Sequence, residues 1–403
     1  MKASRRAVSP TAQTVVGALV VALGSALAGV GAVLGVVAAR MARRVVTPSG
    51  RVPDTRILDV DVAAQTITLG RTPDTALPGR YGLFTSGTAS YLKLGSVLTS
   101  DDAGVKRKLL TRVDEHSSLA AEAAFSGWYY TGPEELHLPY EPELVRAPVG
   151  GCPAWIFPAE TPTDTWVVQI HGRGTARAEC LRAVAVFRDA GITSLLVSYR
   201  NDGEAPRSPG GAYGLGGTEW RDVDAALTVA RRRGARRIVL MGWSMGGAIA
   251  LQVALNSDWR DLVAGIVLES PVLDWRRVLA YQAEVLRLPV PVTGLAIRAL
   301  GAGWATPLTG AESAIEFDRL DIVARAAELR HPILLLHSDD DGFVPSDASH
   351  DLVVARPDLV EMAVFDTARH TKLWNYDEAR WTRTIRQWLG RHGLAGEPTK
   401  IEE

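Results

Sequence analysis

The sequence predicts an α/β fold, in which a mostly parallel β-sheet is covered by helices on both faces. Short apolar runs recur from about residue 144 onward, stretches of helical length separate them, and the runs are apolar throughout rather than alternating. Strands of this kind are typical of a parallel sheet that is buried on both faces. We therefore expect one α/β domain over residues 144–396.

The elements of this domain are expected to alternate along the chain. Apolar runs predict strands at residues 166–170, 193–199, 238–242, 265–268, 333–337 and 360–365. Helices are predicted at residues 176–190, 218–233 and 245–256, and another one begins near residue 374. Between residues 272 and 329 the alternation stops and Gly and Pro interrupt a helical pattern, which indicates an inserted helical cap over the strand ends.

Residues 47–143 have a different pattern. Short alternating stretches, separated by turn residues such as those at 72–74, predict a small β-rich region. The stretches are residues 57–69, 91–98, 108–113 and 125–130. No chemical motif occurs among them, so we expect a docking or covering domain.

Residues 14–39 predict a transmembrane helix. They contain no charged residue, and about 20 apolar residues are enough to cross the hydrocarbon core. A secretory signal has an apolar region of only about 7–15 residues, and basic clusters at both ends argue against a buried core helix. With three basic residues before the run and four after it, charge selects no orientation. We expect residues 1–46 to be a single-pass N-terminal membrane anchor, with the side of the remaining chain undetermined.

Composition excludes some classes of partner. Lys and Arg total 44 and Asp and Glu total 45, so nucleic acid is not an expected ligand. The hydrophobic share of 47% is ordinary for a protein with a sizeable core. Cys152 and Cys180 are the only cysteines, which leaves one disulfide open, and without a CxxC motif no thiolate zinc site is expected.

The strongest functional signal is the segment G-W-S-M-G-G at residues 242–247. A serine presented on a sharp strand-to-helix turn needs glycines two positions before and after it, because a Cβ atom would clash there. Gly242 and Gly246 occupy those positions. The context predicts Ser244 as a nucleophile and the backbone N–H of Met245 as an oxyanion donor at a helix N-terminus. A Gly-rich structural turn is the alternative.

The segment H-G-R-G at residues 171–174 directly follows a predicted strand. In this kind of architecture the loop after such a strand supplies the second oxyanion donor. Gly172 and Gly174 let the backbone approach a substrate closely, and we assign the donor to the N–H of Arg173. A plain turn is the alternative, and the position upstream of Ser244 argues against it.

A serine nucleophile needs a base that an acid holds in place. The expected chain order is Ser, then Asp or Glu, then His. Three consecutive acids, Asp339, Asp340 and Asp341, follow a predicted strand, and the residues alone leave the choice among them open. His370 follows the last predicted strand and is the expected base. The other histidines are expected to be structural or exposed.

Four segments, HGRG, GWSMGG, HSDDDGFVP and ARHTKLW, resemble the α/β-hydrolase superfamily, with a leaning toward its esterase and prolyl-oligopeptidase-like branches. The resemblance covers roughly residues 145–390. In that family the acid commonly stands in a His-Gly-x-x-Asp-x-x-Val-Pro pattern, which aligns with residues 337–345. The resemblance therefore implies Asp341 as the acid, although Ser338 replaces the glycine of the pattern.

Together these residues predict a serine hydrolase that cleaves carboxylic esters through an acyl-enzyme on Ser244. The expected substrate is a small hydrophobic or lipid-derived ester, and no metal or organic cofactor is expected. A prolyl-oligopeptidase-like peptidase and an acyltransferase or thioesterase use the same triad and stay open. A non-catalytic binding protein on the same fold is a further alternative, but such proteins usually lack one member of the triad.

Overall fold

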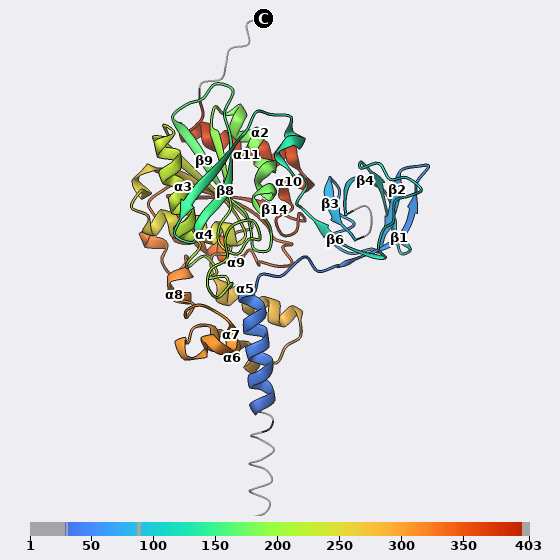
Figure 1. Ribbon diagram of the computed structural model, residues 1–403, viewed down its shortest axis with the longest axis horizontal. Helices are drawn as coiled ribbons and strands as arrows, with labels where there is room; N and C mark the ends of the chain where they lie inside the picture. The colour runs from blue at the N-terminus through green and yellow to red at the C-terminus, as the bar shows by residue number, and fades with distance from the viewer. Residues whose placement is uncertain (1–28, 30, 87–89, 397–403) are drawn as a thin grey trace, which may run out of the picture.

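The computed structural model describes residues 29, 31–86 and 90–396. Three parts follow one another along the chain: a helix, a small closed β-barrel and a larger α/β domain (Figure 1). In the view of Figure 1 the barrel lies to one side of the α/β domain and the helix projects below it.

Residues 31–46 are helical and are called the N-terminal helix. Ala38, Ala42 and Val46 are buried in the core of the α/β domain, at the four-residue spacing of one helix face. The carbonyl of Val46 accepts a hydrogen bond of 2.7 Å from the backbone N–H of Tyr213, which fastens the end of the helix. No helix within the described residues is long and apolar enough to cross a membrane. Most of the predicted span lies outside those residues.

Six antiparallel strands close into a barrel in the order β1-β2-β5-β4-β3-β6. The strands are β1 (Thr55–Asp61), β2 (Thr66–Leu69), β3 (Tyr81–Phe84), β4 (Tyr91–Asp101), β5 (Gly104–Leu109) and β6 (Glu122–Ser126). Leu92 and Leu94 of β4 point inward at the two-residue period of a strand. The region predicted to be β-rich therefore forms a barrel with its own small core.

Arg107 is fully buried inside this barrel. Its guanidinium donates hydrogen bonds of 2.7 to 3.1 Å to the carbonyl oxygens of Thr75, Leu77, Gly79 and Gly95. Burial lowers the pKa of Arg107 to about 10. The side chain holds the loop between β2 and β3 against β4, and that loop is one of the parts of the barrel that meet the α/β domain.

The α/β domain is built on an eight-stranded sheet in the order β14-β13-β12-β11-β9-β10-β8-β7. The strands are β7 (Glu141–Ala147), β8 (Gly150–Phe157), β9 (Thr165–Ile170), β10 (Thr193–Val197), β11 (Arg237–Trp243), β12 (Val263–Glu269), β13 (Ile333–Ser338) and β14 (Val360–Phe365). Strands β9 to β14 are parallel and match the six predicted strands, which confirms the predicted fold class.

Strands β7 and β8 form an antiparallel edge that the sequence pattern does not predict. Pro142, Pro153 and the pair Gly150-Gly151 interrupt the apolar pattern there, and such residues weaken the signal of a strand. Residues 141–143 pair with β8, although the sequence assigned them to the β-rich region.

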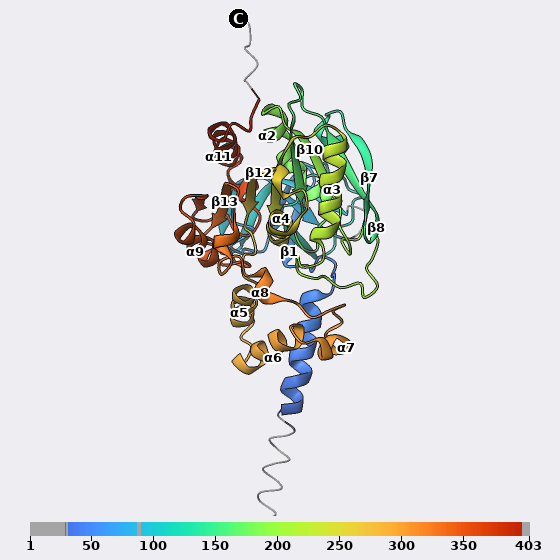
Figure 2. The ribbon, with the colours of Figure 1, turned by 90° about the vertical axis from the view of Figure 1, so that its left-hand side faces the viewer.

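Helices cover both faces of the sheet (Figure 2). Helices α3 (Trp220–Arg232), α4 (Met245–Asn256) and α9 (Asp347–Ala355) share one core, and α2 (Val184–Asp189) and α11 (Glu378–Arg391) share the other. In β11, Ile238 and Leu240 belong to the first core and Val239 and Met241 to the second. Burial on both faces explains why these strands are apolar throughout.

Residues 272–329, called the cap, lie between β12 and β13. They contain α5 (Trp275–Val285), α6 (Val290–Leu300), α7 (Thr306–Thr309) and α8 (Phe317–Leu320). Both views place α5, α6 and α7 beside the N-terminal helix (Figures 1 and 2). The indole N–H of Trp275 donates to the carbonyl of Leu215 at 2.8 Å and fixes the start of the cap.

Replacing Arg107 by Met should destabilise the barrel, because several buried carbonyl groups would lose their donor. Each unpaired buried acceptor costs about 1–3 kcal/mol, so we expect the free energy of unfolding of the barrel to fall by roughly 3 kcal/mol or more. Amide hydrogen exchange of β4 and β5 in increasing urea measures this change. Lys108→Met, at the exposed neighbouring position, is the control and should change it by less than about 0.5 kcal/mol. Equal effects of the two substitutions would contradict the role of Arg107.

Candidate active site

Ser244 lies on the sharp turn between β11 and α4. Its backbone φ and ψ are 51° and −117°, a conformation that residues other than glycine rarely adopt. A Cβ atom on Gly246 would lie 2.1 Å from the carbonyl oxygen of Ile170, and one on Gly242 would lie 2.4 Å from the carbonyl oxygen of Gly246. Both distances are far below van der Waals contact, so the turn requires glycine at both positions.

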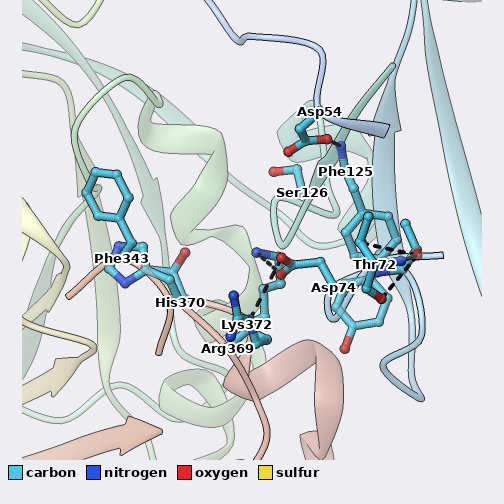
Figure 3. Close-up of polar contacts among 12 residues, drawn as sticks. Asp54, Thr72, Asp74, Phe125, Ser126, Phe343, Arg369, His370 and Lys372 are labelled. Atoms are coloured by element: carbon cyan, nitrogen blue, oxygen red, sulfur yellow. Dashed lines mark hydrogen bonds and ion pairs between the residues drawn. The ribbon is translucent and has the colours of Figure 1, made fainter. Parts of the chain in front are cut away.

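The side chains of Ser244, His370 and Asp341 form one hydrogen-bonded chain. His370 Nε2 lies 3.0 Å from Ser244 Oγ, and His370 Nδ1 lies 2.8 Å from Asp341 Oδ2. Ser244 and Asp341 are buried, and the partly buried ring of His370 contacts the ring of Phe343 (Figure 3). The structure thus brings together the three residues that the sequence singled out on three separate loops.

Asp341 is held in its ionised form. Burial alone would raise the pKa of this carboxyl, but the charge of His370 and hydrogen bonds from His337 and His370 hold the pKa well below its usual range. Its second oxygen accepts hydrogen bonds from the backbone N–H groups of Phe343 and Val344 at 2.8 and 2.9 Å. A carboxylate in this position favours the tautomer of His370 with the proton on Nδ1, which leaves Nε2 able to accept a proton.

The other two aspartates of the run have different partners. Asp339 contacts His350 at 2.8 Å, and Asp340 contacts Arg369 at 3.1 Å. The hydrogen bond from His350 lowers the pKa of Asp339. The residues alone left three candidate acids open, and only Asp341 lies against the predicted base.

The loop of residues 171–174 passes close to the serine. A Cβ atom on Gly172 would lie 3.4 Å from the Cβ atom of Ser244. The backbone N–H of Gly172 donates to Glu179 Oε2 at 2.9 Å, which fixes the start of the loop. Gly174 has a φ of +71°, a conformation that favours glycine.

The two predicted oxyanion donors are backbone groups of Arg173 and Met245. Among the described residues, neither N–H donates to a protein acceptor. Met245 is the first residue of α4, where helical N–H groups have no partner within the helix. The side chain of Arg173 points away and donates to the carbonyls of Arg44 and Thr47 at 2.8 and 3.2 Å. This side chain therefore links the loop to the end of the N-terminal helix.

A buried ion pair that sequence reasoning missed joins this loop to the loop of the histidine. Arg182 lies 3.6 Å from Glu179 and is almost fully buried. Its Nη1 donates to the carbonyl of Thr371 at 2.8 Å and to Asn375 Oδ1 at 2.9 Å. In the sequence, this ion pair is visible only as Glu179 and Arg182, which stand three residues apart in the short stretch before α2.

Glu269 is a second buried acid that sequence reasoning missed. It is fully buried at the end of β12 and accepts hydrogen bonds from the indole N–H groups of Trp243 and Trp381 at 3.0 and 2.8 Å. Burial, which is the largest influence, raises the pKa of Glu269. Its backbone carbonyl accepts from the N–H of Ser244 at 3.0 Å. Glu269 therefore supports the turn from behind.

A pocket of about 280 Å³ lies beside Ser244. Its walls come from four segments. The first is the linker, which we define as residues 47–54 between the N-terminal helix and β1, and the pocket is lined by residues 49–51 of it, 125–127 of the barrel, 172–175 and 370–372. Within the described chain, no residue of the cap lines this pocket. The sequence predicted that the cap covers the strand ends at the site. Instead, the linker and the barrel lie over the pocket, because the cap packs beside the N-terminal helix.

No group of His, Cys, Asp or Glu that could hold a metal occurs in the part of the chain that the structure describes.

The barrel is tied to both sides of His370 (Figure 3). Asp74, in the loop between β2 and β3, lies 2.9 Å from Lys372 Nζ and 3.8 Å from Arg369 Nε. Arg369 and Thr371 have φ values of 57° and 49°, which are uncommon for residues with a side chain. The ion pairs of Asp74 thus hold a strained loop that carries the histidine.

The backbones of the two domains also approach closely. A Cβ atom on Gly79 would lie 2.0 Å from the carbonyl oxygen of Asn375, and one on Gly127 would lie 2.6 Å from that of Thr371. Arg80 and Asn375 exchange two hydrogen bonds, of 3.2 and 2.7 Å. The barrel is therefore docked directly on the segment that follows His370.

Two family models match the chain. One, described as "Alpha/beta hydrolase family", matches residues 167–384. The other, described as "Domain of unknown function (DUF8805)", matches residues 56–126, which correspond to the barrel.

The chain is similar to two curated proteins without a described activity. It is 30% identical over 159 residues to an uncharacterized membrane protein of Saccharomyces cerevisiae, a match that spans 38% of this chain and only 54% of the yeast protein. It is 21% identical over 241 residues to the uncharacterized protein YqkD of Bacillus subtilis, over 58% of this chain and 73% of that protein. The esterase Pf2001 of Pyrococcus furiosus superposes with a TM-score of 0.51 at 16% identity, over 65% of this chain and 94% of the esterase, and this likeness is one of fold.

Asp74→Asn should loosen the loop of His370, because it weakens the ion pairs to Arg369 and Lys372. We expect backbone amides of residues 369–372 to exchange roughly fivefold faster, as a loss of about 1 kcal/mol of local stability implies. Hydrogen exchange read by mass spectrometry measures this. Asp102→Asn, which removes a fully exposed carboxylate of the same barrel, is the matched control. Unchanged exchange in Asp74→Asn would show that the barrel does not hold this loop.

Proposed function

This chain belongs to the alpha/beta hydrolase family, and we propose that it is a serine hydrolase that cleaves carboxylic esters through an acyl-enzyme on Ser244. The observation that carries the proposal is the hydrogen-bonded chain from Ser244 through His370 to Asp341, whose contacts of 3.0 and 2.8 Å are within reach for proton transfer.

The reaction proceeds in two halves. In the first, His370 Nε2 takes the proton of Ser244 Oγ while that oxygen attacks the ester carbonyl, and the protonated ring then gives the proton to the departing alcohol. In the second, a water loses its proton to the same nitrogen and attacks the acyl-enzyme, which releases the acid and restores the serine. Asp341 stabilises the imidazolium in both halves.

The negative charge that develops on the carbonyl oxygen is held by backbone donors. We assign these to the N–H groups of Arg173 and Met245, which flank Ser244 and have no protein acceptor among the described residues. Met245 opens α4, so the positive end of the helix dipole adds to the stabilisation. Such donors typically contribute about 2.7–4 kcal/mol each to the transition state.

We propose a hydrophobic or lipid-like ester as substrate, and residues 14–39 as a membrane span that makes residues 1–46 a single-pass anchor. Arg51 lines the pocket, and the helical residues 40–46 and five further positions separate it from the end of the proposed span. Seven helical residues add about 10 Å and five extended residues at most about 18 Å. A pocket so close to the end of a span is well placed to receive molecules that partition into the membrane, and the yeast relative is itself named a membrane protein.

The peptidase alternative is less well supported. A peptidase of this type needs a carboxylate that is free to hold the ammonium group of a peptide. Glu179 is the carboxylate of the pocket within the described residues, and Gly172 N–H and Thr175 Oγ1 already donate to it at 2.9 and 2.7 Å. Ester hydrolysis needs no such group. Acyltransferase and thioesterase activities use the same triad, and added alcohol or thioester substrates separate them from hydrolysis.

Ser244→Ala should lower turnover of p-nitrophenyl esters by roughly a thousandfold or more, because no other group replaces the nucleophile. A series from acetyl to long acyl chains, with the wild type and the variant side by side, measures this and gives the preferred chain length. Ser100→Ala, which alters an exposed serine of the barrel, is the control. Wild-type rates in Ser244→Ala would remove Ser244 as nucleophile. A wild type that neither hydrolyses esters nor reacts with a fluorophosphonate would favour the non-catalytic alternative.

Asp341→Asn should reduce turnover by about 10⁴-fold, because an amide favours the wrong tautomer of His370. Asp339→Asn is the matched control, since it makes the same chemical change two residues away, where the side chain contacts His350. Its turnover should stay within a few-fold of the wild type. The ratio of kcat values for the two variants on one ester is the measurement, and equal losses would contradict the choice of Asp341.

A further inference from the structure

Exposed apolar side chains gather at one end of the molecule. Eight of the fifteen exposed large hydrophobic residues in the described chain lie in the N-terminal helix and in residues 285–308 of the cap. Val290 and Trp304 are 85% and 79% exposed. These two segments lie side by side in both views, on the side of the α/β domain away from the C-terminal end (Figures 1 and 2). Val33 and Val36 belong to the proposed span. We call the six that lie in the cap the apolar cap face: Val285, Leu286, Val290, Leu295, Trp304 and Leu308.

The same two segments carry basic residues and no acids. Residues 29–46 and 285–311 contain no Asp or Glu. Their charged residues are Arg40, Arg43, Arg44, Arg287 and Arg298. All five are exposed, and among the described residues none of them has a carboxylate partner. Elsewhere on the described surface arginines are commonly paired, as Arg277 is with Asp347 and Asp351. This end of the molecule therefore combines apolar side chains with positive charge that no carboxylate of the described residues neutralises.

We propose that the apolar cap face docks on the surface of a lipid bilayer that contains anionic headgroups. Apolar side chains gain by leaving water at the headgroup boundary, Trp is favoured at that depth, and arginines are attracted to anionic lipids. The inference rests on the membrane span proposed above. Residues 14–28 carry no charge and precede the N-terminal helix in the sequence, and the helix lies beside the cap, so the proposed span and the apolar cap face would meet the same bilayer.

Docking on the bilayer assigns a function to the cap, which contributes no residue to the lining of the pocket within the described chain. Packed beside the N-terminal helix, the cap makes a second contact with the bilayer and stops the α/β domain from turning about a single anchor. The linker at residues 49–51 then holds the pocket at a fixed distance from the membrane surface.

Site-specific quenching in vesicles tests the proposal on the full chain. Trp304→Cys carries an environment-sensitive fluorophore, and Leu144→Cys carries the same fluorophore at an exposed apolar position of β7, away from the cap. Cys152 and Cys180 are buried, and burial raises the pKa of both thiols, so they stay unlabelled. The vesicles contain phosphatidylcholine and phosphatidylglycerol with doxyl groups on shallow acyl carbons. Because interfacial side chains lie about 5–10 Å into the boundary, we expect quenching at position 304 to be roughly threefold or more that at position 144.

A second variant tests the charge. Arg287→Glu together with Arg298→Glu should reduce quenching at position 304 to near the level at position 144, while vesicle flotation stays unchanged because the span is intact. Chain that floats but shows equal quenching at both positions overturns the docking and leaves the span standing. Chain that does not float overturns both. If the fluorophore at position 304 quenches itself more strongly as protein density rises, and the lipid does not quench it, the docking proposal is wrong. The apolar cap face then contacts a second copy of the chain. The readout does not depend on hydrolysis, so it is unaffected by a failure of the proposed activity.

Discussion

The left-handed backbone of Ser244 is the constraint on which the rest of the site depends. A serine with φ of 51° is strained, so the turn persists only because its neighbours leave no other arrangement. Gly242 and Gly246 remove the Cβ atoms that would separate β11, α4 and β9, and the carbonyl of Glu269 holds the N–H of the serine. The close approach in turn brings the loop at residues 171–174 to the side chain. One local backbone conformation thus sets the distance between Ser244 and the loop at residues 171–174.

The histidine is positioned differently, by contacts from two sides. From the interior, Arg182 donates to the carbonyl of Thr371 and is paired with Glu179, which also accepts a hydrogen bond from the loop at residues 171–174. From the outside, Asp74 of the barrel pairs with residues on both sides of His370. The barrel is accordingly both a wall of the pocket and a support for the loop that carries His370.

The parts of the site that the sequence predicted are those that local pattern encodes. Gly242, Ser244 and Gly246 stand within five residues between a strand and a helix, and their roles follow from sterics alone. The acid needed more than local pattern, because three aspartates occupy one turn and only tertiary contacts separate Asp341 from its neighbours. Closure of the barrel pairs Thr55 with Ala123, 68 positions away, and Asp74 contacts residues about 300 positions away. No periodicity reveals such pairs. The cap was recognisable by length and apolarity, but these properties do not tell which surface a segment covers.

Arg173 links the two halves of the proposed function. Its backbone N–H is assigned to the oxyanion, while its guanidinium binds the carbonyls of Arg44 and Thr47 at the C-terminal end of the N-terminal helix. A helix end leaves carbonyls without partners and carries partial negative charge, so a cation there is favourable. Any tilt of the helix against the α/β domain must break these two hydrogen bonds or move the loop that carries the donor. The proposed membrane tether and the proposed oxyanion hole are therefore mechanically coupled through one side chain.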